Sequence, residues 1–151
     1  MNVIFFEDHR ALNLEPISLT RAVFDIRCGA KTFIERVKKL DSIDISALVV
    51  RDELIGVTRD NHPGTSVNPD RFDDGIWLNG SVLWSSDQIE EIRSNPGTGF
   101  FNDEDMIALN LPSKTIDHWM SNGGPLSMKT PKGIIKKKIK VKKADYLWDI
   151  L

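Results

Sequence analysis

The chain has 151 residues, with 20 basic and 22 acidic side chains and a formal net charge of −2, and 40% of its residues are apolar. This is an ordinary globular composition, and it excludes the disordered and fibrous classes. No apolar run approaches the roughly 20 residues of a membrane-spanning helix. The single cysteine, Cys28, excludes an internal disulfide and a cysteine-based zinc cluster.

The N-terminus gives no sign of a secretory signal, because the apolar residues 1–6 are short and are followed at once by Glu7 and Asp8. We therefore expect a cytoplasmic protein without a membrane partner. At this length a single domain over residues 1–151 is expected, either complete or the N-terminal part of a longer protein.

The first predicted elements are two buried strands with a helix between them. Apolar runs at residues 3–6 and 47–50 are typical of strands covered on both faces. A polar loop follows the first run, and Pro16 excludes a helix in its second half. Apolar residues at helical spacing predict an amphipathic helix over residues 30–40, opened by Gly29.

The rest of the chain carries further strands and short helices, separated by turn-rich segments. In chain order we predict a short helix over 53–59, a loop over 60–74, a strand over 76–78 that ends at Asn79-Gly80, a helix over 87–93 capped by Ser85 or Ser86, a hairpin over 99–109, a short helix from Ser113 or Thr115 to Met120, and a lysine-studded strand over 134–141.

This order of elements predicts a three-layer α/β/α sandwich with a mostly parallel, mixed sheet. Ligands of such sheets bind beyond the carboxyl ends of the strands. The segments to inspect are therefore the loop after Phe6, the loop after Val50 and the Asn79-Gly80 corner.

Several common sites are absent from the sequence. The histidines, His9, His62 and His118, share no metal-ligand spacing, so a catalytic zinc site is not expected. The chain has no G-x-S-x-G elbow, no P-loop and no G-x-G-x-x-G, which argues against a hydrolase of the α/β type, a P-loop NTPase and a dinucleotide-binding domain.

Two arginines on the loop after the first strand form a candidate anion site. Arg21 and Arg27 flank a short segment that ends at Gly29, where a helix is expected to begin. Guanidinium groups bind phosphate in a bidentate manner, and a helix N-terminus adds free N–H groups. The alternative is that both arginines only fix the loop through ion pairs with nearby acids, which are Glu7, Asp8 and Asp25.

Several blocks of the sequence resemble a known family. They are I-F-F-E-D at 4–8, E-P-I-S-L-T-R at 15–21, D-I-R-C-G at 25–29, I-W-L-N-G at 76–80, the hairpin at 99–111 and Y-L-W-D at 146–149. Together they resemble sugar nucleotidyltransferases that are distantly related to the uridylyltransferase half of the bifunctional UDP-N-acetylglucosamine pyrophosphorylase/acetyltransferase.

The resemblance implies a truncated nucleotidyltransferase-like fold, in which a sugar 1-phosphate attacks the α-phosphorus of a nucleoside triphosphate and pyrophosphate leaves. Mg²⁺ would hold the phosphates. By position in the matching blocks, the resemblance assigns catalysis to Arg21 and Arg27 and substrate binding to Thr20, Asn79 and Gly80. Lys31, one turn into the predicted helix, would reach the same anion, and Glu7 and Asp8 would hold the metal in compensation for a missing Asp.

The chain also departs from the pattern of the well-characterised enzymes. Glu7-Asp8-His9-Arg10 replaces their glycine-rich loop, and Asn79 stands where they carry a metal-binding Asp. These departures favour an alternative, in which the chain is a catalytically degenerate module that binds nucleotide sugars or regulates an acyltransferase partner. A second copy of the chain is a further candidate partner.

The C-terminal segment is strongly basic, since residues 129–151 carry eight lysines and two acids. Ile139 and Val141 alternate with lysines, which is typical of an edge strand with one solvated face. Binding of phosphate or sugar phosphate is a second interpretation. Nucleic-acid binding is the weakest, because no aromatic residue interleaves the lysines to stack on bases.

Overall fold

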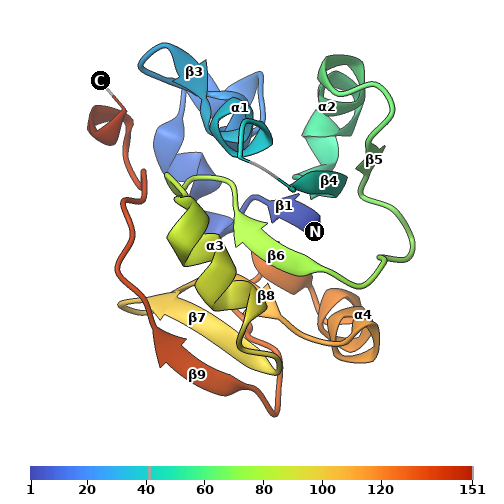
Figure 1. The fold of residues 1–151 in the computed structure, drawn as a ribbon. Coiled ribbons are helices and arrows are strands. Elements are labelled where there is room, and N and C mark those ends of the chain that lie inside the picture. The colour runs from blue at the N-terminus through green and yellow to red at the C-terminus, as the bar shows by residue number, and fades with distance from the viewer. Residues whose placement is uncertain (41, 151) are drawn as a thin grey trace.

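A computed structural model describes residues 1–40 and 42–150, and it shows a central sheet between helices (Figure 1). The strands are β1 (Asn2–Phe6), β2 (Arg27–Cys28), β3 (Lys31–Thr32), β4 (Asp44–Val49), β5 (Ser66–Val67), β6 (Ile76–Asn79), β7 (Thr98–Asn102), β8 (Asp105–Asn110) and β9 (Ile135–Lys138). The helices are α1 (Phe33–Lys38), α2 (Ile55–Asn61), α3 (Ser86–Arg93) and α4 (Ser113–Ser121). Shorter 3₁₀ turns lie at His9–Leu14, Ile17–Leu19, Val23–Asp25, Asp52–Leu54, Gly124–Leu126 and Leu147–Asp149.

The main sheet has seven strands in the order β5-β4-β1-β6-β8-β7-β9. Strands β5, β4, β1 and β6 are parallel to one another, whereas β8 pairs antiparallel with both β6 and β7. This confirms the predicted mixed sheet. Because β4, β1 and β6 run in one direction, the residues that follow them meet at a single carboxyl edge.

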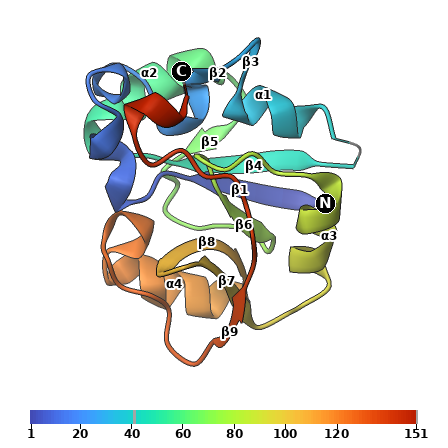
Figure 2. The same cartoon turned by 90° about the vertical axis from the view of Figure 1, so that its left-hand side faces the viewer.

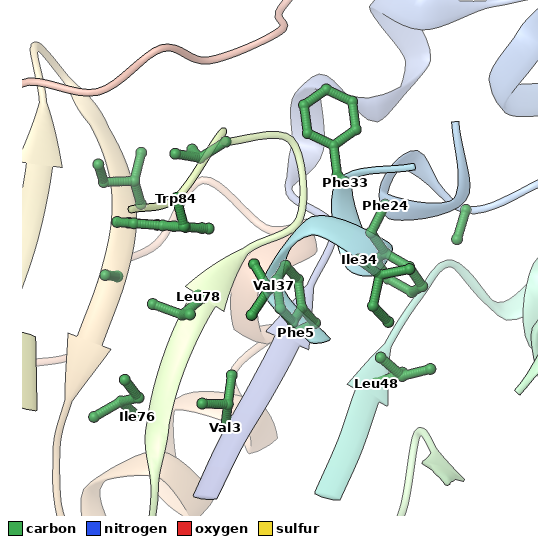
Figure 3. Close-up of a cluster of buried hydrophobic side chains, with 14 of the residues drawn as sticks. Val3, Phe5, Phe24, Phe33, Ile34, Val37, Leu48, Ile76, Leu78 and Trp84 are labelled. Carbon is green, nitrogen blue, oxygen red and sulfur yellow. The ribbon is translucent and has the colours of Figure 1, made fainter. Parts of the chain in front are cut away.

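Strand β1 lies inside the sheet between β4 and β6, and its residues Val3 to Phe6 are fully buried. Val3 and Phe5 belong to a core cluster with Ile34 of α1 and Ile89 of α3, and Figure 3 shows Phe5 beside side chains of α1. Ile4 and Phe6 belong to the opposite cluster, which α4 covers. The four-residue apolar run therefore forms the predicted strand, with a helix layer against each face.

The helix predicted over residues 30–40 is shorter than expected and begins at Phe33. Gly29 does not open it: with φ at 76° it lies in the turn of the small β2–β3 hairpin, where a glycine carries no steric penalty. The helix begins after Thr32, whose hydroxyl and Glu35 form a capping box. Lys31 consequently lies on β3 and not one turn into a helix.

The other predicted helices and strands agree with the structure apart from their ends, but the loop predicted over 60–74 is wrong in part, because Ser66–Val67 form β5, which pairs with β4 at the edge of the sheet. Ser85 caps α3 through a capping box with Gln88. The loop predicted over 7–20 contains two 3₁₀ turns, the first capped by Asp8. Strand β9 is an edge strand, as the first interpretation of the lysine-studded segment expects, but all four of its residues are exposed and it ends at Lys138, before Ile139 and Val141. Among the described residues, no helix has the length and apolar character needed to span a bilayer.

After β9 the chain crosses the carboxyl edge of the sheet (Figure 2). The backbone N–H of Leu83 donates to the carbonyl of Lys142 at 2.9 Å, and that of Ala144 donates to the carbonyl of Ser81 at 2.8 Å. These two bonds hold Lys143 beside the end of β6, at the edge where ligands of α/β sheets bind.

Candidate functional site

The carboxyl edge of the sheet carries a compact polar cluster. Glu7 and Asp8 follow β1, Arg51 lies two residues after β4, and Asn79 ends β6. All four residues are buried. The cluster is therefore a product of the parallel strand order, which brings three separate segments to one place.

Glu7 and Arg51 form a buried ion pair at the centre of this edge. Arg51 Nε lies 3.0 Å from Glu7 Oε2, and Arg51 Nη2 donates to the carbonyl of Ser18 at 2.6 Å. The Glu7 side chain has no exposed surface, and its Oε1 atom has no hydrogen-bond partner among the described residues. Burial raises the pKa of Glu7 to about 7, because loss of hydration outweighs the attraction of Arg51.

Asp8 is held by three donors from different parts of the chain. Its Oδ1 accepts from the backbone N–H of Arg10 at 3.0 Å, and its Oδ2 accepts from Asn79 Nδ2 at 2.8 Å. Lys143 Nζ lies 3.3 Å from the same Oδ2 and also pairs with Asp145. Only 2% of the Lys143 side chain is exposed. Its ammonium group is thus a buried cation at the end of β1 and β6.

Asn79 and Gly80 form the corner that follows β6. Asn79 Oδ1 accepts from the backbone N–H of Ser81 at 2.9 Å and from Ser81 Oγ at 2.7 Å. The amide of Asn79 is therefore bonded on both sides within the protein, and in this structure it shapes the corner. Gly80 lies against Phe24, which directly precedes the D-I-R-C-G segment.

Replacing Gly80 by alanine should destabilise the protein by about 1–3 kcal/mol, the usual range for overpacking. A methyl group at this position would lie 2.8 Å from Cδ2 of Phe24, a fully buried ring. Urea unfolding measures the effect. Gly56→Ala in α2 is the matched control, because nothing lies within 4 Å of the added methyl group. Equal stability of the two variants would contradict close packing of this corner.

The predicted phosphate-binding arginines lie on the surface next to this edge. Arg21 and Arg27 are both exposed, and neither forms an ion pair within residues 1–40 and 42–150. The alternative that they fix the loop by ion pairs is wrong, because the acids have other partners. Glu7 pairs with Arg51, Asp8 with Lys143, and Asp25 with His62 at 2.6 Å.

The other predicted binding residues are dispersed. Thr20 is exposed beside Arg21, and Arg27 Nη1 donates to the carbonyl of Ala30 at 2.8 Å within the hairpin turn. A hydrogen bond and charge repulsion from Lys39 lower the pKa of Lys31, which places Lys31 beside the end of α1. The structure thus groups Glu7, Asp8, Asn79 and Gly80 at the carboxyl edge, whereas Arg27 lies in the hairpin and Lys31 lies beside Lys39.

The carboxylates of Glu7 and Asp8 do not fit a resident magnesium ion in this arrangement. Hard divalent cations need several free oxygen ligands, yet a guanidinium group binds one carboxylate and an ammonium group binds the other. Within the described part of the chain, no three His, Cys, Asp or Glu side chains converge as a metal site.

Two cations of this cluster, Arg51 and Lys143, were missed by reasoning from the sequence. Arg51 could have been found, because it directly follows the second predicted strand and so shares the edge with Glu7. Lys143 carries no such signal. Its position depends on the return of the C-terminal segment across the sheet, and it is one of the eight lysines within residues 129–151.

Comparison with known proteins adds an independent observation to this geometry. The profile of the sugar nucleotidyl transferase family matches residues 3–151, which is nearly the whole chain. A search of curated proteins finds no match. The mixed α/β sheet, with its polar cluster at the carboxyl edge, is consistent with that family's fold. The chain therefore belongs to the sugar nucleotidyl transferase family.

Proposed function

We propose that this protein transfers a nucleotidyl group from a nucleoside triphosphate to a sugar 1-phosphate. A phosphate oxygen of the sugar phosphate attacks the α-phosphorus, the bond to the β-phosphate oxygen breaks, and pyrophosphate leaves. Such chemistry depends on positioning and charge neutralisation, which cationic side chains supply. UTP and N-acetylglucosamine 1-phosphate are the first pair to test, because the family that the sequence resembles is distantly related to the uridylyltransferase half of the bifunctional UDP-N-acetylglucosamine pyrophosphorylase/acetyltransferase.

The observation that carries this proposal is that Arg21 is exposed, forms no ion pair with any residue that the structure describes, and belongs to the segment that Arg51 ties to the carboxyl edge. Its neighbours Ala22 and Phe24 are completely buried, so the backbone that bears Arg21 is anchored while the guanidinium group faces solvent. Arg51 further fastens this segment through the carbonyl of Ser18. Thr20, Arg21 and Arg27 would meet the triphosphate, with Lys31 as a more distant cation, while Asn79 and Gly80 would position the substrate.

Magnesium enters this proposal as the counterion that accompanies the triphosphate and not as a resident of the Glu7–Asp8 corner. The carboxylates there already have cationic partners. Mg²⁺ commonly binds through substrate phosphates together with only one or two protein ligands.

Replacing Arg21 by alanine should lower kcat/KM by about 100-fold, which is typical for removal of one group that stabilises developing charge. Pyrophosphate release from UTP and N-acetylglucosamine 1-phosphate measures the reaction. Arg71→Ala removes another exposed arginine from the loop before β6 and should leave the rate unchanged. Equal rates for Arg21→Ala and wild type would overturn the assigned role.

A second candidate function is a catalytically degenerate module that binds nucleotide sugars and regulates an acyltransferase. The filled carboxyl edge favours it, because Ala144 is buried there and the hollow between Asp8, Asn79 and Ala144 has no room for a water molecule. Thermal shifts with UTP and UDP-N-acetylglucosamine test it. Stabilisation by the nucleotide sugar without any pyrophosphate release would favour this module over the enzyme.

A further inference from the structure

A large hollow lies between α4 and the segment that leads into β9, and its lining contains no arginine among the described residues. It is a groove of about 870 Å³, within the size range of sites for small molecules. We call it the lysine groove. Its lining includes Lys129, Lys132, Lys136, His118, Trp119 and Ile134.

The charge of the lysine groove is entirely of one sign. Its lining contains three lysines and no acidic residue. None of these lysines forms an ion pair within residues 1–40 and 42–150. Cations that gather in a concave surface without counter-charge focus a positive potential and concentrate anions.

Strand geometry explains why Lys136 faces the groove. Side chains alternate along β9, so Lys136 and Lys137 point to opposite faces of the sheet. Lys137 pairs with Glu91 of α3 at 3.0 Å, on one face. Lys136 lines the groove on the α4 face, with its ammonium 5.7 Å from the centre of the Phe101 ring. The geometry of β9 therefore determines that Lys136, and not Lys137, lies on the groove side of the sheet.

The segment that leads into β9 forms the wall opposite α4, and hydrogen bonds within the protein hold it in place without a ligand. The indole N–H of Trp119 donates to the carbonyl of Lys129 at 3.0 Å, and the backbone N–H of Lys129 donates to Ser127 Oγ at 3.3 Å. Pro131 is buried in the same segment. These contacts fix the backbone of the wall, which reduces the ordering that a ligand would have to induce.

The lysine groove is also continuous with the carboxyl edge of the sheet. A smaller hollow of about 40 Å³ shares Met128, Lys129 and Thr130 with it and reaches Phe6 and Asp8 at the end of β1. Three acids line this smaller hollow, so the uninterrupted positive surface is confined to the groove; they are Asp8, Glu104 and Asp105.

We propose that the lysine groove binds the phosphate group of a substrate. The identity of that substrate as a sugar 1-phosphate or a nucleoside triphosphate rests on the proposed function, whereas the preference for phosphate stands on the groove itself. A nucleic acid is disfavoured, because the aromatic residue of the lining, Trp119, is only 2% exposed and offers no face for a base.

The test compares two double variants that remove the same charge. Lys132→Ala/Lys136→Ala removes two cations from the groove, whereas Lys114→Ala/Lys137→Ala removes two exposed cations that do not line it. Calorimetric titration with pyrophosphate, N-acetylglucosamine 1-phosphate and UTP measures binding. We expect about tenfold weaker binding in the groove variant and no change in the control, as for two partly screened charges.

The ligand series separates the two sources of phosphate. A loss confined to N-acetylglucosamine 1-phosphate assigns the groove to the sugar phosphate, and a loss confined to UTP and pyrophosphate assigns it to the triphosphate. Equal binding by both double variants, no binding by wild type, or tighter binding of a single-stranded oligonucleotide than of any of these ligands would overturn the proposal.

Failure of the groove and failure of the proposed function give different results. If phosphate binding depends on the groove lysines but no pyrophosphate is released, the result contradicts the transferase function and supports the phosphate site in the groove. If the groove variant transfers the nucleotidyl group with an unchanged KM for both substrates, the result supports the transferase function and contradicts the phosphate site in the groove.

Discussion

Replacing Arg51 by methionine should lower the free energy of unfolding by about 3–5 kcal/mol at pH 8, the range for removal of one partner of a buried ion pair. Methionine keeps much of the length and the apolar stem of the side chain but leaves the carboxylate of Glu7 buried without a counter-charge. It also frees the carbonyl of Ser18, which Arg51 Nη2 now binds at 2.6 Å. Urea unfolding at fixed pH measures the loss.

The loss should shrink toward pH 5, because Glu7 then carries a proton. Burial raises its pKa in the folded protein to about 7 from an ordinary value of 4.5. The folded state therefore binds more protons than the unfolded state between these values, and the stability associated with Glu7, full below pH 4.5, declines as pH rises through 7. The raised pKa corresponds to about 3 kcal/mol in wild type.

Glu7→Gln isolates this dependence, because glutamine cannot ionise. In wild type, stability should fall between about pH 5 and pH 8 relative to Glu7→Gln. The double variant Glu7→Gln/Arg51→Met should show strong coupling between the two positions at pH 8 and weak coupling at about pH 5. A pH-independent loss in Arg51→Met would mean that the guanidinium group acts only through Ser18.

Local patterns in the sequence are sufficient to predict most of the sheet. The run at residues 3–6 is apolar at every position, which indicates burial on both faces, and the structure places it in the interior strand β1. Ser85 with Gln88 three residues later is the pattern of a capping box, and α3 begins there. Such features depend on neighbours in the chain and are therefore readable without the fold.

The prediction of the first helix is wrong at its start because two local signals overlap. Gly29 ahead of an apolar helical pattern indicates a helix opener, yet glycine equally favours a tight turn, and here it forms the turn of a hairpin. The pattern of Thr32 and Glu35 is the better indicator, since it matches the capping box that begins α1. This shift moves Lys31 from the helix to the hairpin.

The partners of the acidic residues could not be predicted from local patterns. Glu7 has several candidate cations nearby in the sequence, but its partner is Arg51, 44 residues away. Asp8 is paired with Lys143, which only the return of the C-terminal segment brings to the edge. The choice among competing cations is made by strand order and chain path, and both are properties of the whole fold.

The hydrogen bonds of Asn79 explain why an amide stands where the expected pattern has an aspartate. An aspartate is expected at this position for a metal-binding enzyme, but the amide of Asn79 donates to Asp8 Oδ2 at 2.8 Å. A carboxylate there would face another carboxylate and would have no proton to donate. The neutral amide is therefore the side chain that satisfies both Asp8 and Ser81.

Replacing Asn79 by aspartate should consequently destabilise the protein by about 3 kcal/mol at pH 8, the scale of an uncompensated buried charge. Repulsion between the introduced carboxylate and Asp8 raises the pKa of one of the two groups, so protonation toward about pH 5 restores the donated hydrogen bond and part of the stability. Asn79→Leu is the control: it removes the same hydrogen bonds without adding charge, so its loss should not shrink in the same way toward low pH. Wild-type stability of Asn79→Asp at pH 8 would mean that Lys143 neutralises both carboxylates and that the corner tolerates the aspartate.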